Sequence, residues 1–357
     1  MGIYHFRPHL KQIWLISNHP CKRHGLFTEY FYTFLRRLPP ETGHAFGLSL
    51  LSHAPIRVDF DVQSFSVNTS FGRLRNPIGL AAGFDKQGKY VKALQRLGFG
   101  YIVAGTVTRM RREGLPKPRI VRREKEEALV NAMGFPNPGL EKFLENISKN
   151  KPYEVPVVIS VADENPQHLL ECYGEAQRHA DAIEINISSP NTPQLRHYFN
   201  PALFRDVAES LAAEKTKPTY LKIPPYSNSE EKEAIYRVVK IWFETGFTGV
   251  TAVNALLVDE PRVSARKGGL SGKPLLPYML RVVSEVREMV GSGFEIHALG
   301  GVFTGKDVYE ALRRGANTVQ LYTALVYRGP YTVKKILEEL RHVMAEKGVD
   351  SVESITV

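Results

Sequence analysis

The stretch AIEINISSPNTPQLR, residues 182–196, is a short apolar run followed directly by a polar loop. Ile183 and Ile185 are β-branched residues at alternate positions, and they predict that the run is a buried strand. Pro190 and Pro193 fix two backbone φ angles, so the loop cannot continue as a helix. A stiff loop rich in amides and hydroxyls at a strand end suits a planar polar small molecule. An ordinary Asx/Ser-Pro turn is the alternative for this stretch taken alone.

Apolar runs of this kind recur along the chain and alternate with helical patterns. Eight runs occupy residues 77–81, 101–106, 156–161, 182–187, 219–223, 249–253, 295–300 and 318–322. The helical patterns include residues 88–97, 166–179, 201–214, 229–245, 277–289, 305–313 and 331–346. Eight strands alternating with eight helices predict an α/β fold, the (β/α)₈ or TIM barrel. A doubly wound open sheet is the competing fold, but no GxGxxG motif follows the first run.

Residues 1–56 differ from the barrel segment, 57–357, and are predicted to form a small N-terminal helical module. Residues 26–38 are rich in aromatic side chains, and a second short helix after them carries His44. Two short helices with apolar surface and basic flanks indicate either a membrane-associating module or a cap on the barrel. Residues 56–72 alternate like a hairpin, which we expect to close the bottom of the barrel.

Composition limits the classes of partner. The net charge of +10 favours an anionic substrate, anionic lipid or nucleic acid. Because no basic run with interleaved aromatic residues occurs, we expect no nucleic-acid partner. The two cysteines lack metal-ligand spacing, so no metal site is expected. No apolar run reaches the roughly 18 residues of a membrane span, and residues 1–15 lack the apolar core of a signal peptide. The chain is therefore expected to be soluble or peripheral to a membrane.

The ends of the predicted strands carry the groups from which a ligand can be inferred. Lys222 lies within an otherwise apolar run, where a charge is costly unless it faces an anion or an electron-rich ring. Glycine-rich segments follow the later strands, at 268–272 and at Gly300-Gly301, and such loops bind phosphate in barrels of this type. FMN fits both features, with its phosphate on the glycine loops and Lys222 beside the ring edge that gains negative charge.

Several longer motifs, taken together, identify a family likeness. They are NPIGLAAGFDK (76–86), NAMGF (131–135), NISSPNTPQLR (186–196), GGLSG (268–272) and VQLYTAL (319–325). With these motifs the chain resembles the class 2 dihydroorotate dehydrogenases, membrane-associated flavoenzymes of pyrimidine synthesis that reduce quinones. The resemblance runs from about residue 40 to residue 330.

The resemblance implies a role for each matching residue. FMN contacts would come from Ala82, Gly83, Lys86, Thr106, Asn186, Lys222, Gly272, Gly301, Tyr322 and Thr323. Contacts to dihydroorotate and orotate would come from Lys86, Asn131, Met133, Gly134, Phe135, Asn186, Asn191 and Asn254. Ser189 matches the catalytic base, with Thr192 and Phe135 at the gate to its proton path. A lysine for the carboxylate and asparagines for the pyrimidine-dione are chemically suitable partners.

The implied reaction is oxidation of (S)-dihydroorotate to orotate, in de novo UMP synthesis. Ser189 would remove the C5 proton, FMN would take the C6 hydride, and ubiquinone or menaquinone would take the electrons. The resemblance places the quinone in a tunnel between the N-terminal helices, lined by His44 and Arg122. It also favours the membrane-associating reading of residues 1–56, at the cytoplasmic face of a bacterial inner membrane.

Three positions depart from the family pattern. Ser160 replaces an asparagine on the third strand, Val253 replaces a flavin-contacting threonine, and Ala255 replaces a threonine or serine. Each change removes a hydrogen bond, typically worth about 0.5–1.5 kcal/mol. These losses would weaken FMN or orotate binding, or reflect another planar substrate for an FMN barrel. A non-enzymatic barrel that binds flavin or a pyrimidine is a further alternative.

Overall fold

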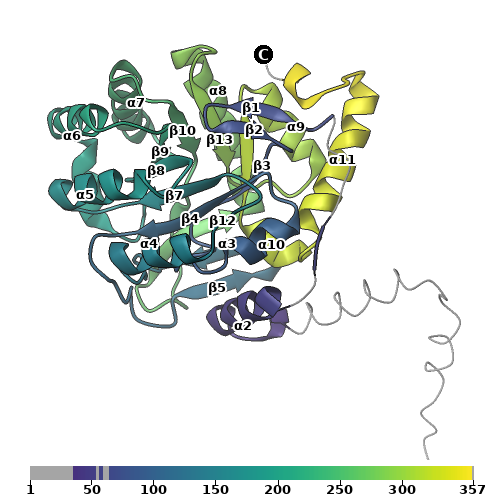
Figure 1. Cartoon of the computed structure of the whole chain (residues 1–357), viewed down its shortest axis with the longest axis horizontal. Coiled ribbons are helices and arrows are strands. Elements are labelled where there is room, and N and C mark those ends of the chain that lie inside the picture. Colours follow the sequence, from purple (N-terminus) through teal and green to yellow (C-terminus); the bar gives the residue numbers. More distant parts are fainter. Residues whose placement is uncertain (1–34, 54–55, 59–63, 356–357) are drawn as a thin grey trace, which may run out of the picture. The chain divides into compact units, whose positions relative to one another are not determined.

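The computed structural model describes residues 35–53, 56–58 and 64–355 (Figure 1). The chain divides into two compact units, Met1–Gly47 and Leu48–Val357, and the barrel belongs to the second. Most of the predicted helix at 26–38 lies outside the described residues. Of its described part, residues 35–37 are helical. The proposed division at residue 56 therefore remains a prediction.

The predicted TIM barrel is confirmed. Eight parallel strands close on themselves in the order β10-β13-β14-β3-β4-β7-β8-β9. Their bounds are β3 (Ile78–Leu80), β4 (Tyr101–Val107), β7 (Val157–Val161), β8 (Ala182–Asn186), β9 (Thr219–Ile223), β10 (Gly249–Ala252), β13 (Glu295–Leu299) and β14 (Thr318–Leu321). These strands are buried almost throughout, as is usual for a parallel sheet covered by helices. Each coincides with one of the eight apolar runs to within about a residue or two.

Helices cover the outside of the barrel, and α5, α6 and α7 pack in sequence along one flank (Figure 1). Their bounds are α3 (Val91–Leu94), α4 (Leu140–Lys149), α5 (Pro166–Gln177), α6 (Pro201–Ala213), α7 (Ser229–Glu244), α8 (Leu276–Val290), α9 (Gly305–Arg313), α10 (Thr323–Arg328) and α11 (Thr332–Lys347). Side chains cap several N-termini, as Asn165 does for α5 and Asn200 for α6. The helical pattern at 88–97 forms only the short α3 and a 3₁₀ turn at Gln95–Leu97.

A β-hairpin closes the end of the barrel opposite the strand C-termini. Strands β1 (Val67–Thr69) and β2 (Gly72–Leu74) pair antiparallel, so the hairpin lies further along the chain than the predicted 56–72. Phe71 at its tip is buried, and its ring packs edge-on against Tyr101 and His297, with centroids 5.4 and 5.8 Å away. The predicted plug is therefore confirmed, with its position corrected.

A second sheet was not predicted from the sequence. Strands β5 (Ile120–Arg123), β6 (Ala128–Asn131), β11 (Leu256–Asp259) and β12 (Lys267–Gly272) form an antiparallel sheet in the order β11-β12-β6-β5. The expectation that 268–272 is a loop was wrong, because this segment is most of β12. Its glycines allow close packing instead of a turn, since a Cβ on Gly268 would lie 2.7 Å from the carbonyl oxygen of Asn131.

Helix α2 (Pro40–His53) is the predicted second short helix, and it begins with a proline and an acidic residue, which suit a helix N-terminus. Leu48 and Leu51 are buried in the main core, and Arg96 donates a hydrogen bond to the Leu51 carbonyl. Phe46 and Leu50 on the same helix are 47% and 38% exposed. Within the described ranges, no helix combines the length and apolarity that a bilayer crossing requires.

Candidate active site

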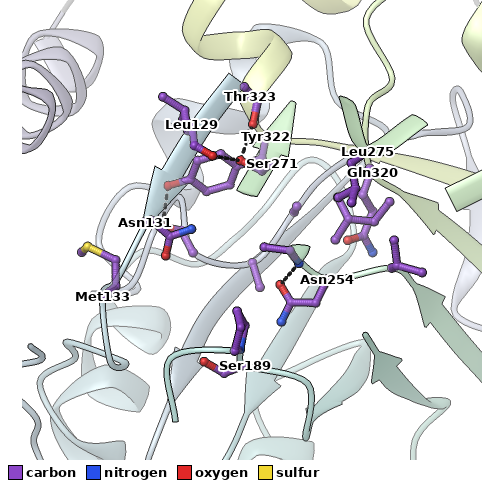
Figure 2. Close-up of a pocket in the computed structure, with 18 of the residues that line it drawn as sticks. Leu129, Asn131, Met133, Ser189, Asn254, Ser271, Leu275, Gln320, Tyr322 and Thr323 are labelled. Atoms are coloured by element: carbon purple, nitrogen blue, oxygen red, sulfur yellow. Dashed lines mark hydrogen bonds between the residues drawn. The ribbon is translucent and has the colours of Figure 1, made fainter. Parts of the chain in front are cut away.

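A pocket opens where the barrel strands end, and it brings together most of the residues that the resemblance implied (Figure 2). They are Ala82, Gly83, Lys86, Thr106, Asn131, Met133, Gly134, Phe135, Asn186, Ser189, Asn191, Lys222, Asn254, Gly272, Gly301, Tyr322 and Thr323. The C-terminal ends of barrel strands are the usual location of catalytic groups in this fold.

The asparagine loop after β8 is joined to the loop after β10. Asn186 accepts hydrogen bonds from the backbone N–H and the hydroxyl of Ser188, at 3.2 and 2.9 Å. Asn254 donates its amide to the Ser188 hydroxyl at 2.9 Å. Ser188 is buried, so it fixes two asparagine side chains relative to each other at the floor of the pocket.

Ser189 follows in the same loop and faces the pocket (Figure 2). Its hydroxyl oxygen accepts a hydrogen bond from the Asn191 backbone N–H at 3.4 Å and another from the Thr192 hydroxyl at 3.5 Å. Thr192 itself is buried and does not line the pocket. Two donors directed at one oxygen stabilise negative charge on it, which is the environment that a serine acting as a base requires.

The loop between β6 and α4 forms another wall of the pocket. Asn191 donates its side-chain amide to the Asn131 carbonyl and side-chain oxygens at 3.0 and 3.3 Å, so this wall is tied to the serine loop. Phe135 lines the pocket with a φ of 55°, a conformation that bulky residues rarely adopt. Buried Asn137 holds it there by donating a hydrogen bond to the Phe135 carbonyl at 2.8 Å.

Glycines shape the opposite wall. A Cβ on Gly272 would lie 2.4 Å from the Glu127 carbonyl, and one on Gly301 would lie 2.3 Å from the Leu276 backbone nitrogen. Both residues have positive φ, at 103° and 76°. Ser271 completes this wall and exchanges a hydrogen bond of 2.9 Å with Thr323 (Figure 2). Backbone and hydroxyl donors in a wall without side-chain bulk suit a phosphate group.

Lys86 and Tyr322 occupy the side near β3. Lys86 donates a hydrogen bond to the Gly83 carbonyl, and the Tyr322 hydroxyl donates to the same oxygen at 3.4 Å. Burial raises the pKa of Tyr322 to about 12, so its hydroxyl stays protonated at neutral pH. Asp85 orders the loop by accepting backbone N–H bonds, including one of 2.7 Å from Tyr90.

Lys222 lies between the pocket and a buried carboxylate. Its Nζ is 3.5 Å from Oε1 of Glu184, and the Ser160 hydroxyl donates to the same oxygen at 3.0 Å. From Ser160 the hydrogen bonds continue to Thr106 at 3.0 Å and to the Asn186 amide at 3.1 Å. The departure at Ser160 therefore belongs to a polar network beneath the pocket and does not line the pocket itself.

Sequence reasoning missed three polar residues at this site, namely Ser271, Gln320 and Glu184. Gln320 lines the pocket and is 2% exposed, and its Oε1 accepts no hydrogen bond from the described residues. Gln320 and Glu184 each interrupt an apolar strand with a polar residue, and this signal is the same one that identified Lys222.

The departures from the family pattern and the predicted tunnel residues lie in different parts of the structure. Val253 and Ala255, two of the departures, line the pocket. His44 lies on α2 in the first unit, and Arg122 lies on β5 in the second. Neither is among the residues lining this pocket, so the quinone tunnel remains a prediction.

Comparison with known proteins agrees with this site. The family model described as dihydroorotate dehydrogenase matches residues 65–344. A quinone-type dihydroorotate dehydrogenase of Coxiella burnetii is 34% identical, over 87% of this chain and 96% of its own length. One of Bordetella avium is 36% identical, over 75% of this chain and 82% of its own.

A solved structure extends the likeness to three dimensions. The DHODH of Eimeria tenella, crystallised in complex with ferulenol, superposes with a TM-score of 0.81 at 28% identity. The match covers 88% of this chain and 94% of that one. The chain therefore belongs to the dihydroorotate dehydrogenase family, and its quinone-type relatives place it with the members that oxidise dihydroorotate in pyrimidine biosynthesis.

Proposed function

We propose that this protein oxidises (S)-dihydroorotate to orotate with FMN as hydride acceptor and a quinone as final acceptor. The observation that carries the proposal is the pocket itself, in which Ser189, Lys86 and a group of asparagines meet the glycine wall and Lys222. Family membership supports the substrate and the use of a flavin, and the names of the curated relatives support a quinone.

The residues present fit FMN. The glycine wall has no room for a Cβ at Gly272 or Gly301, which leaves backbone N–H groups to meet a phosphate. Lys222 and the Gln320 side chain, whose Oε1 accepts no hydrogen bond from the described residues, would face the polar edge of the ring system. When bound, FMN would supply the hydride acceptor and the electron carrier to the quinone.

The substrate would bind between Lys86 and the four pocket asparagines. The Lys86 ammonium would pair with the substrate carboxylate, which is a charge-assisted contact. Asn131, Asn191 and Asn254 are held by hydrogen bonds to neighbouring groups, so they would offer their remaining donors and acceptors to a pyrimidine-dione in fixed orientations. Phe135 would exclude water above the substrate.

Ser189 would accept the C5 proton of dihydroorotate. Its oxygen receives hydrogen bonds from the Asn191 N–H and the Thr192 hydroxyl, and both contacts favour the alkoxide, the form of serine that is basic enough to take the C5 proton. Thr192 lies at the buried side of Ser189, so it is also the residue through which we expect the proton to leave.

The acceptor is tested by steady-state turnover of (S)-dihydroorotate with different oxidants. We expect turnover with ubiquinone and menaquinone analogues, and none with fumarate or NAD. Efficient turnover with fumarate or NAD, or equal turnover of the (R) enantiomer, would contradict the proposal.

Membrane association at the cytoplasmic face of a bacterial inner membrane belongs to the same proposal. Quinones are lipid-soluble, and α2 exposes Phe46 and Leu50 at 47% and 38%. Exposed apolar residues on a short helix, on a chain with net charge +10, suit a surface of anionic lipid.

A further inference from the structure

Lys222 contacts a second charged group inside the barrel, the carboxylate of Glu184. The two side chains are 4% and 1% exposed, and the distance from Lys222 Nζ to Glu184 Oε1 is 3.5 Å. Within the part of the chain that the structure describes, no other cation forms an ion pair with Glu184. The two side chains therefore form an ion pair that is shielded from solvent inside the barrel.

The carboxylate is held in place by the neighbouring strand. Ser160 on β7 stands opposite Glu184 on β8 and donates its hydroxyl to Oε1 at 3.0 Å. The second oxygen, Oε2, is buried and accepts no hydrogen bond from the described residues. A carboxylate with so few donors keeps most of its negative charge available to act on Lys222.

Lys222 is also a lining residue of the pocket, so its ammonium lies between Glu184 and the proposed flavin. Reduction of a flavin adds negative charge to its ring, and a nearby uncompensated cation stabilises the reduced form. A carboxylate paired with that cation has the opposite effect.

We propose that Glu184 is a positioning residue that lowers the reduction potential of the bound flavin by offsetting the charge of Lys222. The inference rests on the proposed FMN site at Lys222. Under this inference Ser160, which departs from the family pattern, orients the Glu184 carboxylate through its hydrogen bond. A lower potential favours onward transfer of electrons to the quinone over uptake from dihydroorotate.

The test is the midpoint potential of the flavin, measured by anaerobic redox titration of the full-length, FMN-loaded protein against a reference dye. Glu184→Gln keeps the shape of the side chain and removes its charge. We expect the ratio of affinities for reduced and oxidised flavin to increase at least tenfold, a rise of about 30 mV for a two-electron couple. Glu184→Asp keeps the charge on a shorter side chain, so its potential should lie between wild type and Glu184→Gln.

Glu295→Gln is the matched control. Glu295 begins β13 at the closed end of the barrel, where it accepts hydrogen bonds from Tyr220 and Ser70 at 2.6 Å. Its neutralisation should leave the potential at the wild-type value. Unchanged potentials in both Glu184 variants, or an equal rise in Glu295→Gln, would overturn the inference. A wild-type protein that takes up no flavin would instead overturn the proposed function, and this inference with it.

Discussion

One oxygen atom, the Oγ of Ser189, carries the proton transfer in the proposed reaction. Ser189→Ala removes the only group in the pocket that we assign as base, so flavin reduction by dihydroorotate should slow by about 10²–10⁴-fold. Stopped-flow absorbance measures this rate directly. Binding of orotate to the variant should persist, because the lysine and asparagine contacts are intact.

Ser189→Cys is the matched variant for this prediction, since it puts a thiol of similar size in place of the hydroxyl. A thiol has a pKa near 8.5, well below that of a hydroxyl, so part of the rate should return and its pH dependence should move to lower pH. Full activity of Ser189→Ala at neutral pH would exclude Ser189 as the base.

The glycine wall gives a second prediction at the scale of one residue. Gly301→Ala places a methyl group 2.3 Å from the Leu276 nitrogen at a φ of 76°, so the loop must shift. We expect FMN affinity to fall at least tenfold, with a loss of about 1–3 kcal/mol in unfolding free energy. Calorimetric titration with FMN and thermal unfolding measure the two effects.

Gly348→Ala is the control that separates the effect of backbone strain from the effect of disturbing the glycine wall. Gly348 has a φ of 66°, but a Cβ there would meet nothing within 4 Å. This control should cost about 1 kcal/mol in stability and leave FMN affinity at the wild-type value. Equal FMN affinity in the two variants would show that the wall around Gly301 is not part of the cofactor site.

At the scale of elements, periodicity predicted the barrel strands because each is a short apolar run between turn signals. The sheet of β5, β6, β11 and β12 was missed because the apolar runs in β5 (IVRR), β6 (ALVN) and β11 (LLVD) have only two or three residues, and half of β12 (KGGLSG) is glycine. In β12 glycines occupy positions where only a hydrogen atom fits against β6, and this reason is invisible without the partner strand. Local sequence carries little information about such contacts.

The site residues likewise divide into those that the sequence predicted and those that it did not. The resemblance predicted Ser189 and Gly301 as site residues, and the structure brings both into one pocket because each follows the end of a barrel strand. Glu184 and Gln320 were overlooked although each is a polar residue in a buried strand. Their partners lie on other strands, so their role becomes visible only when the barrel closes.

An ion-pair cluster between the loop after β11 and the end of β5 predicts a pH dependence of stability. Hydrogen bonds from Arg262, opposed by burial and assisted by Arg123, lower the pKa of Glu260 to about 2, against 4.5 for the free group. A carboxyl whose pKa is depressed by folding stabilises the protein above its unfolded pKa. That stabilisation should be lost as the pH falls from about 4.5 to 2.

Glu260→Gln isolates this contribution. The difference in unfolding free energy between wild type and variant should be largest near pH 6 and shrink toward pH 2, by at most about 3 kcal/mol. Urea unfolding at several pH values measures it. A difference that stays constant across this range would mean that the charge of Glu260 contributes nothing.

At the scale of the whole molecule, the sequence predicted a soluble or peripheral chain with a membrane-associating module, and α2 lies in that segment. Phe46→Asn with Leu50→Asn removes the exposed apolar pair. We expect binding to anionic vesicles to weaken by about tenfold, because each side chain contributes roughly 1.5–3 kcal/mol when fully buried and less at a lipid surface. Vesicle sedimentation measures the binding.

Met110→Asn is the control for this pair, since Met110 is 63% exposed in the barrel unit. Its vesicle binding should equal that of wild type. Flavin reduction by dihydroorotate should be unaffected in both proteins, while turnover with vesicle-bound quinone should fall only in the α2 variant. An equal loss of vesicle binding in the two proteins would contradict a role for α2.

The central claim is that this barrel binds a flavin and reduces it with dihydroorotate. Its most direct test is anaerobic addition of (S)-dihydroorotate to the FMN-loaded protein, with flavin absorbance followed near 450 nm, a wavelength that belongs to the cofactor. We predict rapid bleaching that added quinone reverses. A yellow protein whose absorbance does not change would contradict the assignment of the substrate, and a protein that takes up no FMN would contradict the flavin site itself.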